Sequence, residues 1–93
     1  MKTPTAERRA AERRPVEGEV RLRQTGVIAP PFGGTLVDLS ASGFRARHAC
    51  LALKSGDRVD FEFAGMSGCA RAVWTRIVDG RAETGFSILE SGG

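Results

Sequence analysis

Apolar and polar residues alternate without a break over residues 58–64, and this pattern constrains the fold more than any other feature of the sequence. Val59, Phe61 and Phe63 fall on one side of the segment, and the acidic residues between them fall on the other. A side-chain period of two is typical of a β-strand that buries one face and exposes the other. We therefore expect a half-buried strand here, with its three apolar side chains in the core.

Five further short segments have strand character and are separated by turn-forming residues. They span residues 16–23, 35–40, 43–48, 69–78 and 81–89. The Asp79-Gly80 pair is a strong signal for a two-residue hairpin turn, and residues 65–68 predict a second tight reversal. No amphipathic helix of useful length is present. Short strands at this spacing predict an all-β fold, and a small six-stranded antiparallel β-barrel is favoured because closure removes exposed edges.

The length of 93 residues allows a single domain and excludes both a two-lobed enzyme and a barrel of alternating strands and helices. Residues 1–14 show no hydrophobic periodicity, so we expect a flexible basic arm there. The barrel is predicted to span residues 15–90, and residues 91–93 are expected to form a disordered tail.

Positive charge is concentrated at the N-terminus. The formal net charge is +3, and residues 1–23 contain seven basic and four acidic residues, so they carry the whole excess. Six of those seven basic residues are arginine. The planar guanidinium matches phosphate and the edge of guanine, which suggests an anionic, nucleotide-like partner. A solvated charged tail with no partner is the alternative reading.

Cysteine usage and hydropathy give no sign of a metal site, an export signal or a membrane span. Cys50 and Cys69 stand 19 positions apart with one histidine in the chain, which does not fit a zinc site, and we expect two buried free thiols. No apolar run approaches the ~18 residues of a membrane helix, and the N-terminus does not resemble a secretory signal. A cytoplasmic protein without membrane insertion is the expectation.

The sequence offers no catalytic constellation. His48 is the one histidine, and the alternation places it on the same strand face as Phe44 and Ala46, as expected for a structural side chain. Neither of the common glycine-rich phosphate-binding loops occurs. We therefore predict a binding module and not an enzyme.

Two motifs carry residue types suited to recognition. Arg9 and Arg13 form an R-x-x-x-R spacing in the arm, and Arg8 precedes them. Residues 38–43 lie between two predicted strands and form a D-x-S-x-x-G motif, whose defining residues are Asp38, Ser40 and Gly43. Each motif alone has a local explanation, since Asp and Ser cap turns and Gly supplies a positive φ or a close backbone approach.

Together and in this order, the two motifs resemble the PilZ domain family, small bacterial β-barrels that bind cyclic di-GMP. The resemblance covers residue 7 to about residue 90. A late tryptophan strand and a following glycine-hydrophobic pair are also typical of the family, and Val73-Trp74 and Gly85-Phe86 fit that pattern. Many members carry a C-terminal helix that this sequence lacks, and we expect a monomer or a weak dimer.

The resemblance implies a bacterial second-messenger receptor whose ligand is cyclic di-GMP, with no cofactor or metal. Arg9 and Arg13 would contact a guanine edge and a phosphate, Asp38 the N–H donors of guanine, and Ser40 a phosphate or an amine. Gly43 would allow a close backbone approach.

Arg8 and Trp74 complete the expected ligand-binding set. Arg8 is a candidate for a further phosphate contact or for a second ligand molecule. Trp74 could form an aromatic wall of the site, and a core position is its alternative.

Ligand binding is expected to order the arm over the barrel and so alter a surface for a downstream protein partner. A PilZ-like adaptor that does not bind the nucleotide is the alternative. A nucleic-acid-binding barrel is disfavoured because the sequence contains no tyrosine, Phe61 and Phe63 are predicted to be buried, and residues 24–93 carry no net charge, so we expect no DNA or RNA partner.

Overall fold

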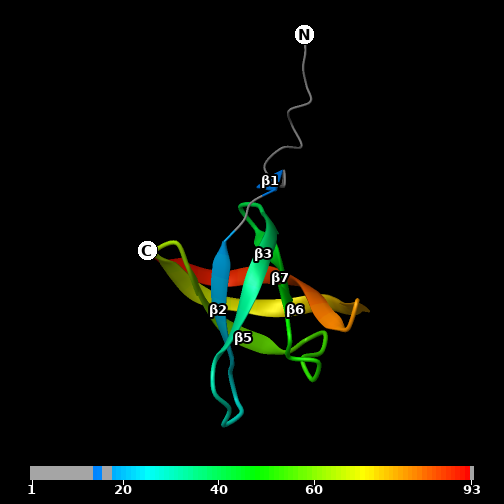
Figure 1. Cartoon of the computed structure of the whole chain (residues 1–93). Coiled ribbons are helices and arrows are strands. Elements are labelled where there is room, and N and C mark those ends of the chain that lie inside the picture. The colour runs from blue at the N-terminus through cyan, green and yellow to red at the C-terminus, as the bar shows by residue number, and fades with distance from the viewer. Residues whose placement is uncertain (1–13, 16–17, 93) are drawn as a thin grey trace.

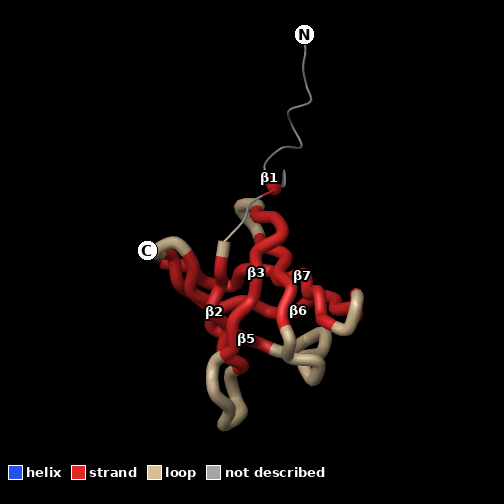
Figure 2. Tube along the Cα trace, viewed as in Figure 1, coloured by secondary structure: helices blue, strands red, loops and turns tan. Residues whose placement is uncertain are grey.

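Strands make up all the regular secondary structure of the part of the chain that the computed structural model describes, residues 14–15 and 18–92 (Figure 2). They are β1 (Arg14–Pro15), β2 (Glu19–Gln24), β3 (Phe32–Leu39), β4 (Gly43–His48), β5 (Arg58–Phe63), β6 (Met66–Val78) and β7 (Arg81–Gly92). The predicted all-β fold is confirmed. No helix in these residues is long and apolar enough to cross a membrane.

Six of the strands close into an antiparallel barrel. Their order around the barrel is β3-β2-β5-β6-β7-β4, and a further pairing between β3 and β4 joins the two ends of the sheet. The two-residue β1 pairs with β3 beyond the end of β2. The predicted six-stranded barrel is therefore confirmed, with β1 as a short addition. In this ring β2 lies opposite β7.

Several strand boundaries differ from the expected ones. β3 begins at Phe32 and not at residue 35, because the segment read as a glycine-rich loop pairs with β2 from Phe32 onward. Gly34 is buried there, and a Cβ at this position would lie 2.7 Å from the carbonyl oxygen of Arg47. Close backbone packing therefore explains this glycine within a strand.

The two tight hairpins turn through residues with positive φ. Asp79 and Gly80 have φ values of 53° and 79°, which confirms the predicted two-residue turn. The reversal expected at 65–68 lies slightly earlier, at Ala64 and Gly65, with φ values of 49° and 80°. A run of two such residues is typical of the type I′ turn, whose twist matches that of the flanking strands.

The C-terminal end of the chain is paired. β7 continues to Gly92, and its last residues lie opposite Ser67 and Gly68 of β6. The expectation of a disordered tail from residue 91 is therefore wrong at Ser91 and Gly92. The long partner strand β6 supplies the pairing that the sequence did not predict.

Aromatic side chains fill the centre of the barrel. Phe44 lies at ring-centroid distances of 5.1 Å from Phe61, 5.5 Å from Phe63 and 4.9 Å from Phe86. The predicted inward positions are confirmed on β2 and β5, whose buried apolar residues are Val20, Leu22, Val59, Phe61 and Phe63. Val16, predicted to share this face, lies outside the described residues.

His48 is fully buried among these apolar residues, as predicted. Its Nδ1 atom accepts a hydrogen bond from the backbone N–H of Cys50 at 3.2 Å, so Nε2 carries the proton toward Thr84 Oγ1 at 2.8 Å. Cys50 and Cys69 are free thiols but only half-buried, which corrects the expectation of two buried thiols. Cys69 Sγ lies 3.9 Å from Glu90 Oε1 at the surface.

The turn between β3 and β4 lies at the same end of the barrel as β1, and the loop between β2 and β3 lies at the other end (Figure 1). The β6–β7 hairpin runs across the barrel between these two ends. This arrangement places β1 at the same end of the barrel as the D-x-S-x-x-G turn.

Candidate functional site

Pairing between β1 and β3 places β1 beside the first residues of the D-x-S-x-x-G motif. Arg14 lies opposite Leu39, and Pro15 lies opposite Asp38. The predicted ligand-binding residues Arg8, Arg9 and Arg13 lie outside the described residues. Arg14, which follows Arg13 in the sequence, is the first residue that the structure describes, and its strand β1 pairs with the part of β3 that contains Asp38.

A β-bulge in β3 aims Asp38 at the outer surface of the barrel. Leu36 pairs with Ala46, and Asp38 pairs with Arg45, so Val37 is the extra residue. In a regular strand residue 38 would face the core, because it lies two positions after the inward-facing Leu36. The bulge reverses that alternation, as bulges beside functional sites often do.

The Asp38 carboxylate is held by Arg45. Arg45 Nε donates a hydrogen bond of 2.9 Å to Asp38 Oδ2, and its Nη2 forms an ion pair with the same oxygen. Asp38 is 5% exposed, so the pair is protected from solvent on one side. The hydrogen bond to Asp38 and the nearby carboxylates raise the pKa of Arg45, which therefore remains charged at any physiological pH.

Ser40 closes the turn between β3 and β4. Its backbone N–H donates to the carbonyl of Gly43 at 2.8 Å, and its Oγ donates to the same carbonyl at 3.3 Å. Ser40 Oγ also lies 3.4 Å from Ser42 Oγ, which is on the exposed side of the turn. In the described residues Ser40 thus has the local capping role that its residue type allows.

Gly43 is required by a close approach of β4 to β7. A Cβ at this position would lie 2.1 Å from the carbonyl oxygen of Phe86, which is backbone and cannot move aside. Its φ is not among the positive values, so a left-handed conformation is not the reason for this glycine. Of the roles considered for Gly43, close backbone approach is the one observed, and the approaching backbone is that of β7.

A second bulge places Trp74 on the same outer surface. Ala72 pairs with Phe86 and Trp74 pairs with Gly85, so Val73 is the extra residue of β6. Trp74 is 36% exposed and not a core residue, which excludes the core alternative. Its ring covers Gly85, where a Cβ would lie 2.3 Å from the indole Nε1. Arg76 lies over the indole at 5.7 Å from the ring centroid.

Three arginines surround the carboxylate of Glu83 on this surface. Glu83 Oε2 lies 3.6 Å from Arg45 Nη1 and 3.5 Å from Arg76 Nη2, and Oε1 lies 3.6 Å from Arg47 Nε. Arg47 and Arg76 sit directly opposite Glu83 on the neighbouring strands. The result is a cationic surface across β4, β7 and β6 that can accept an anionic group.

Two rows of side chains therefore cross the outer face of β3, β4, β7 and β6. One row contains Asp38, Arg45, Gly85 and Trp74, and the other contains Arg47, Glu83 and Arg76. Sequence reasoning did not identify Arg45, Arg47, Arg76 and Glu83. Alternation within residues 43–48 and 81–86 could have indicated that Arg45, Arg47 and Glu83 face outward, because each lies between inward-facing residues.

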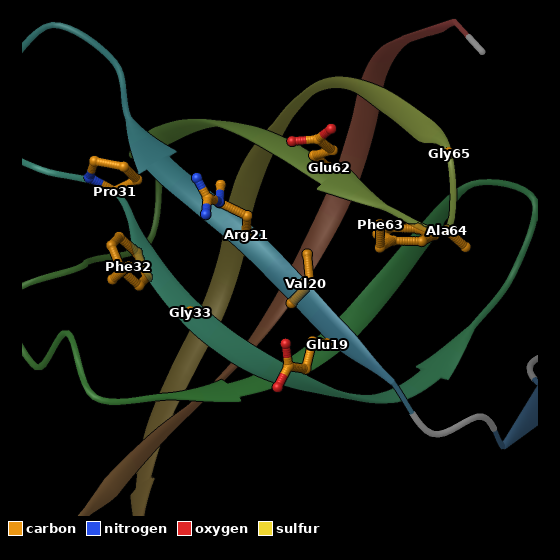
Figure 3. Close-up of a pocket in the computed structure, with 10 residues that line it drawn as sticks. All are labelled: Glu19, Val20, Arg21, Pro31, Phe32, Gly33, Glu62, Phe63, Ala64 and Gly65. Carbon is orange, nitrogen blue, oxygen red and sulfur yellow. The ribbon is translucent and has the colours of Figure 1, made fainter.

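A hollow of about 420 Å³ lies elsewhere, over β2 and its neighbours (Figure 3). Glu19, Arg21 and Glu62 line it together with apolar residues of β3 and the β5–β6 turn. None of the D-x-S-x-x-G residues, nor Trp74, belongs to this lining. The hollow reaches only the start of β3, at Phe32 and Gly33, whereas the face described above includes the end of β3 at Asp38.

Comparison with protein families identifies the fold that carries this face. A family model described as PilZ domain matches residues 7–91, nearly the whole chain. The chain belongs to the PilZ domain family. PilZ domains bind cyclic di-GMP and act as binding or effector modules rather than catalysts. A comparison with curated proteins found no similar sequence.

The match includes both arginine positions of the arm and the whole of the β3–β4 turn. Among residues 14–15 and 18–92, no cluster of three or more potential metal ligands occurs. The outer face of β3, β4, β7 and β6 carries Asp38 of the D-x-S-x-x-G motif together with Trp74 and the arginines around Glu83.

Proposed function

We propose that this PilZ domain is a non-enzymatic receptor for cyclic di-GMP, which binds on the outer face formed by β3, β4, β7 and β6. The observation that supports the proposal most is the pairing of β1 with β3. It joins the segment that follows Arg13 to the strand that presents Asp38. A ligand with two phosphates and two guanines is recognised by cationic and carboxylate groups together, and this pairing supports a site that combines the two motifs.

Each group on the face has a part in this recognition. Arg9 and Arg13 contact a phosphate and a guanine edge, and Arg8 adds a phosphate contact. Asp38 accepts hydrogen bonds from guanine N–H groups while it holds Arg45, since a carboxylate can accept about four. The exposed indole of Trp74 offers a stacking surface for a purine.

Ser40 and Gly43 act mainly by shaping the turn. The Ser40 hydroxyl is engaged with the Gly43 carbonyl, and Gly43 allows β4 to approach β7. These contacts support a positioning role for both residues, with any ligand contact made on the outer side of the turn.

Ligand binding also orders the arm that precedes Arg14 over the barrel and changes a surface that a downstream protein partner reads. Arg14 itself, expected in the flexible arm, already pairs with Leu39 in β1. Ordering a residue costs about 1–2 kcal/mol of backbone entropy. One charge-assisted hydrogen bond of about 1.5–3 kcal/mol offsets this cost for roughly one residue, so ordering is expected mainly at the arginines that contact the ligand. Amide hydrogen exchange in residues 6–14 should slow when cyclic di-GMP is added, and equal exchange with and without ligand would refute the ordering.

Isothermal titration with cyclic di-GMP tests the receptor function. The wild-type domain should bind at micromolar concentration or tighter, and Arg13→Ala should weaken binding by at least about tenfold because it removes a charge-assisted contact. Arg58→Ala is the matched control, since it removes one exposed arginine from β5 and should bind like wild type.

A folded wild-type domain that gives no binding signal would refute the receptor function and favour the adaptor without nucleotide. Single-stranded RNA serves as a second titrant. Binding to RNA with a steep salt dependence, in place of cyclic di-GMP, would point to nucleic-acid recognition.

A further inference from the structure

Glu83 occupies an unusual position for an acidic residue. It lies on the outer face of β7, on the side opposite to its inward-facing neighbours Ala82 and Thr84, yet only 3% of its surface is exposed. The side chains that cover it are themselves polar and charged: Arg45, Arg47 and Arg76. Acidic residues are rarely so buried unless they are paired. Its burial therefore comes from the three arginines around it and not from the core.

The three arginines approach Glu83 from both neighbouring strands and keep much of their own surface. Arg45 and Arg47 come from β4, and Arg76 comes from β6. The side chains of Arg47 and Arg76 are 54% and 61% exposed, although both reach the carboxylate. Each contacts Glu83 through one nitrogen, and a guanidinium carries five N–H donors. The N–H groups of these two arginines that do not contact Glu83 can donate hydrogen bonds to a ligand, while the contacting nitrogens stay paired with the carboxylate.

The arrangement would not persist without the carboxylate. Three guanidinium groups that converge on one point repel one another, and exposed arginine side chains have many accessible rotamers. A central negative charge reverses the repulsion and restricts those rotamers. Glu83 also reaches Arg45, which in turn holds Asp38, so one carboxylate connects both rows of the face.

We infer that Glu83 is a positioning residue of the nucleotide site, which acts by holding Arg45, Arg47 and Arg76 in the orientation that the ligand requires. The inference rests on the proposed binding of cyclic di-GMP to this face. It assigns to Glu83 a role that neither sequence motif contains.

The direction in which one substitution changes the ligand affinity distinguishes positioning of the arginines from a simple effect of net charge. Glu83→Gln removes a negative charge from the face that receives a dianionic ligand. If net charge governed affinity, the variant would bind more tightly. If the carboxylate positions the arginines, the variant binds more weakly despite its extra positive charge. Glu62→Gln is the matched control, because it changes the net charge equally at an exposed site on β5.

Trp74 provides a second readout, since it is the one tryptophan of the chain and lies under Arg76. Release of Arg76 in Glu83→Gln should shift the indole emission of the ligand-free protein. Glu62→Gln should leave the emission unchanged. A residue that only stabilised the fold would lower the unfolding temperature without altering this signal in the folded protein.

The experiment is isothermal titration of wild type, Glu83→Gln and Glu62→Gln with cyclic di-GMP, together with tryptophan emission spectra, well below the unfolding temperatures. We expect about tenfold weaker binding and a shifted emission for Glu83→Gln alone, because one charged contact of this class is worth about that factor. Equal or tighter binding by Glu83→Gln would overturn the positioning role while leaving the receptor function intact. Absence of binding by wild type would overturn both.

Glu83→Asp keeps the test valid if the glutamine variant does not fold. It retains the charge but shortens the side chain by one methylene, which withdraws the carboxylate from the arginines. Weaker binding by a folded Glu83→Asp supports the inference, and wild-type affinity overturns it.

Discussion

Two extra residues, Val37 and Val73, determine which side chains lie on the outer face of β3, β4, β7 and β6. Each inserts a bulge that reverses the alternation of its strand, and each is followed directly by a site residue, Asp38 or Trp74. Without the bulges both side chains would point toward the core. The sequence motifs identified Asp38 and Trp74 as candidates, but neither bulge has a sequence signature that alternation alone reveals. The exposure of Trp74 could therefore not be predicted.

Gly43→Ala should destabilise the barrel strongly. The new Cβ would lie 2.1 Å from the Phe86 carbonyl oxygen, so β4 and β7 would have to separate. We expect a loss of about 1–3 kcal/mol in the free energy of unfolding, as in other overpacked sites, measured by urea denaturation. Gly33→Ala is the control, because nothing lies within 4 Å of a Cβ there. Equal stability of the two variants would contradict the packing role of Gly43.

Stability should fall as the pH is lowered below about 6.5. Burial lowers the pKa of His48, and the positive charge of Arg81 adds to the effect. The unfolded chain then binds a proton that the folded chain does not, so folding is favoured fully above the unfolded pKa and less at lower pH. The slope that His48 contributes below the unfolded pKa cannot exceed about 1.4 kcal/mol per pH unit, the value for one proton. His48→Gln should flatten this part of the profile in urea denaturation. An unchanged slope in the variant would show that other groups cause it.

At the scale of elements, the β6–β7 hairpin connects the core to the site. The same two strands carry buried Ala72 and Phe86 inward and Trp74 and Glu83 outward. The existence and direction of this hairpin were predictable because the Asp79-Gly80 turn and the alternation agree. Its full length was not, since Met66–Gly68 and Ser91–Gly92 contain turn-forming residues that become strand only through mutual pairing.

Gly85→Ala should affect ligand binding more than stability. Its Cβ would meet the Trp74 ring, 2.3 Å from Nε1, but the ring is a partly exposed side chain that can swing away. We expect a change below about 1 kcal/mol in stability and a loss of up to about tenfold in affinity for cyclic di-GMP, in line with the value of base stacking on an aromatic ring. Trp74 emission should shift toward that of a solvated indole. Unchanged emission and affinity would remove Trp74 from the site.

At the scale of the whole molecule, closure of the barrel was predictable from strand number and chain length, but the composition of the candidate face on β3, β4, β7 and β6 was not. The face depends on which strands become neighbours, and the order β3-β4-β7-β6 joins residues up to 38 positions apart, from Asp38 to Arg76. A stable single domain of this size also gives ligand binding a measurable effect on unfolding.

Cyclic di-GMP should raise the unfolding temperature of the whole domain. A ligand that binds only the folded state at about 100 times its Kd adds about 2.7 kcal/mol. For a domain of this size, that corresponds to a shift of about 10–20 °C. Differential scanning calorimetry should detect the shift in wild type and little of it in Arg13→Ala. The same shift in both proteins would show that the R-x-x-x-R motif does not contribute to binding.

Titration of the ¹⁵N-labelled domain with cyclic di-GMP, followed by amide and indole NMR shifts, tests binding and its location together. The account predicts the largest changes at Asp38, Ser40, Arg45, Glu83 and the Trp74 indole N–H. It predicts small changes over the hollow on β2, at Arg21 and Glu62. Absence of changes, or changes confined to the β2 and β5 face, would contradict a nucleotide site on β3, β4, β7 and β6.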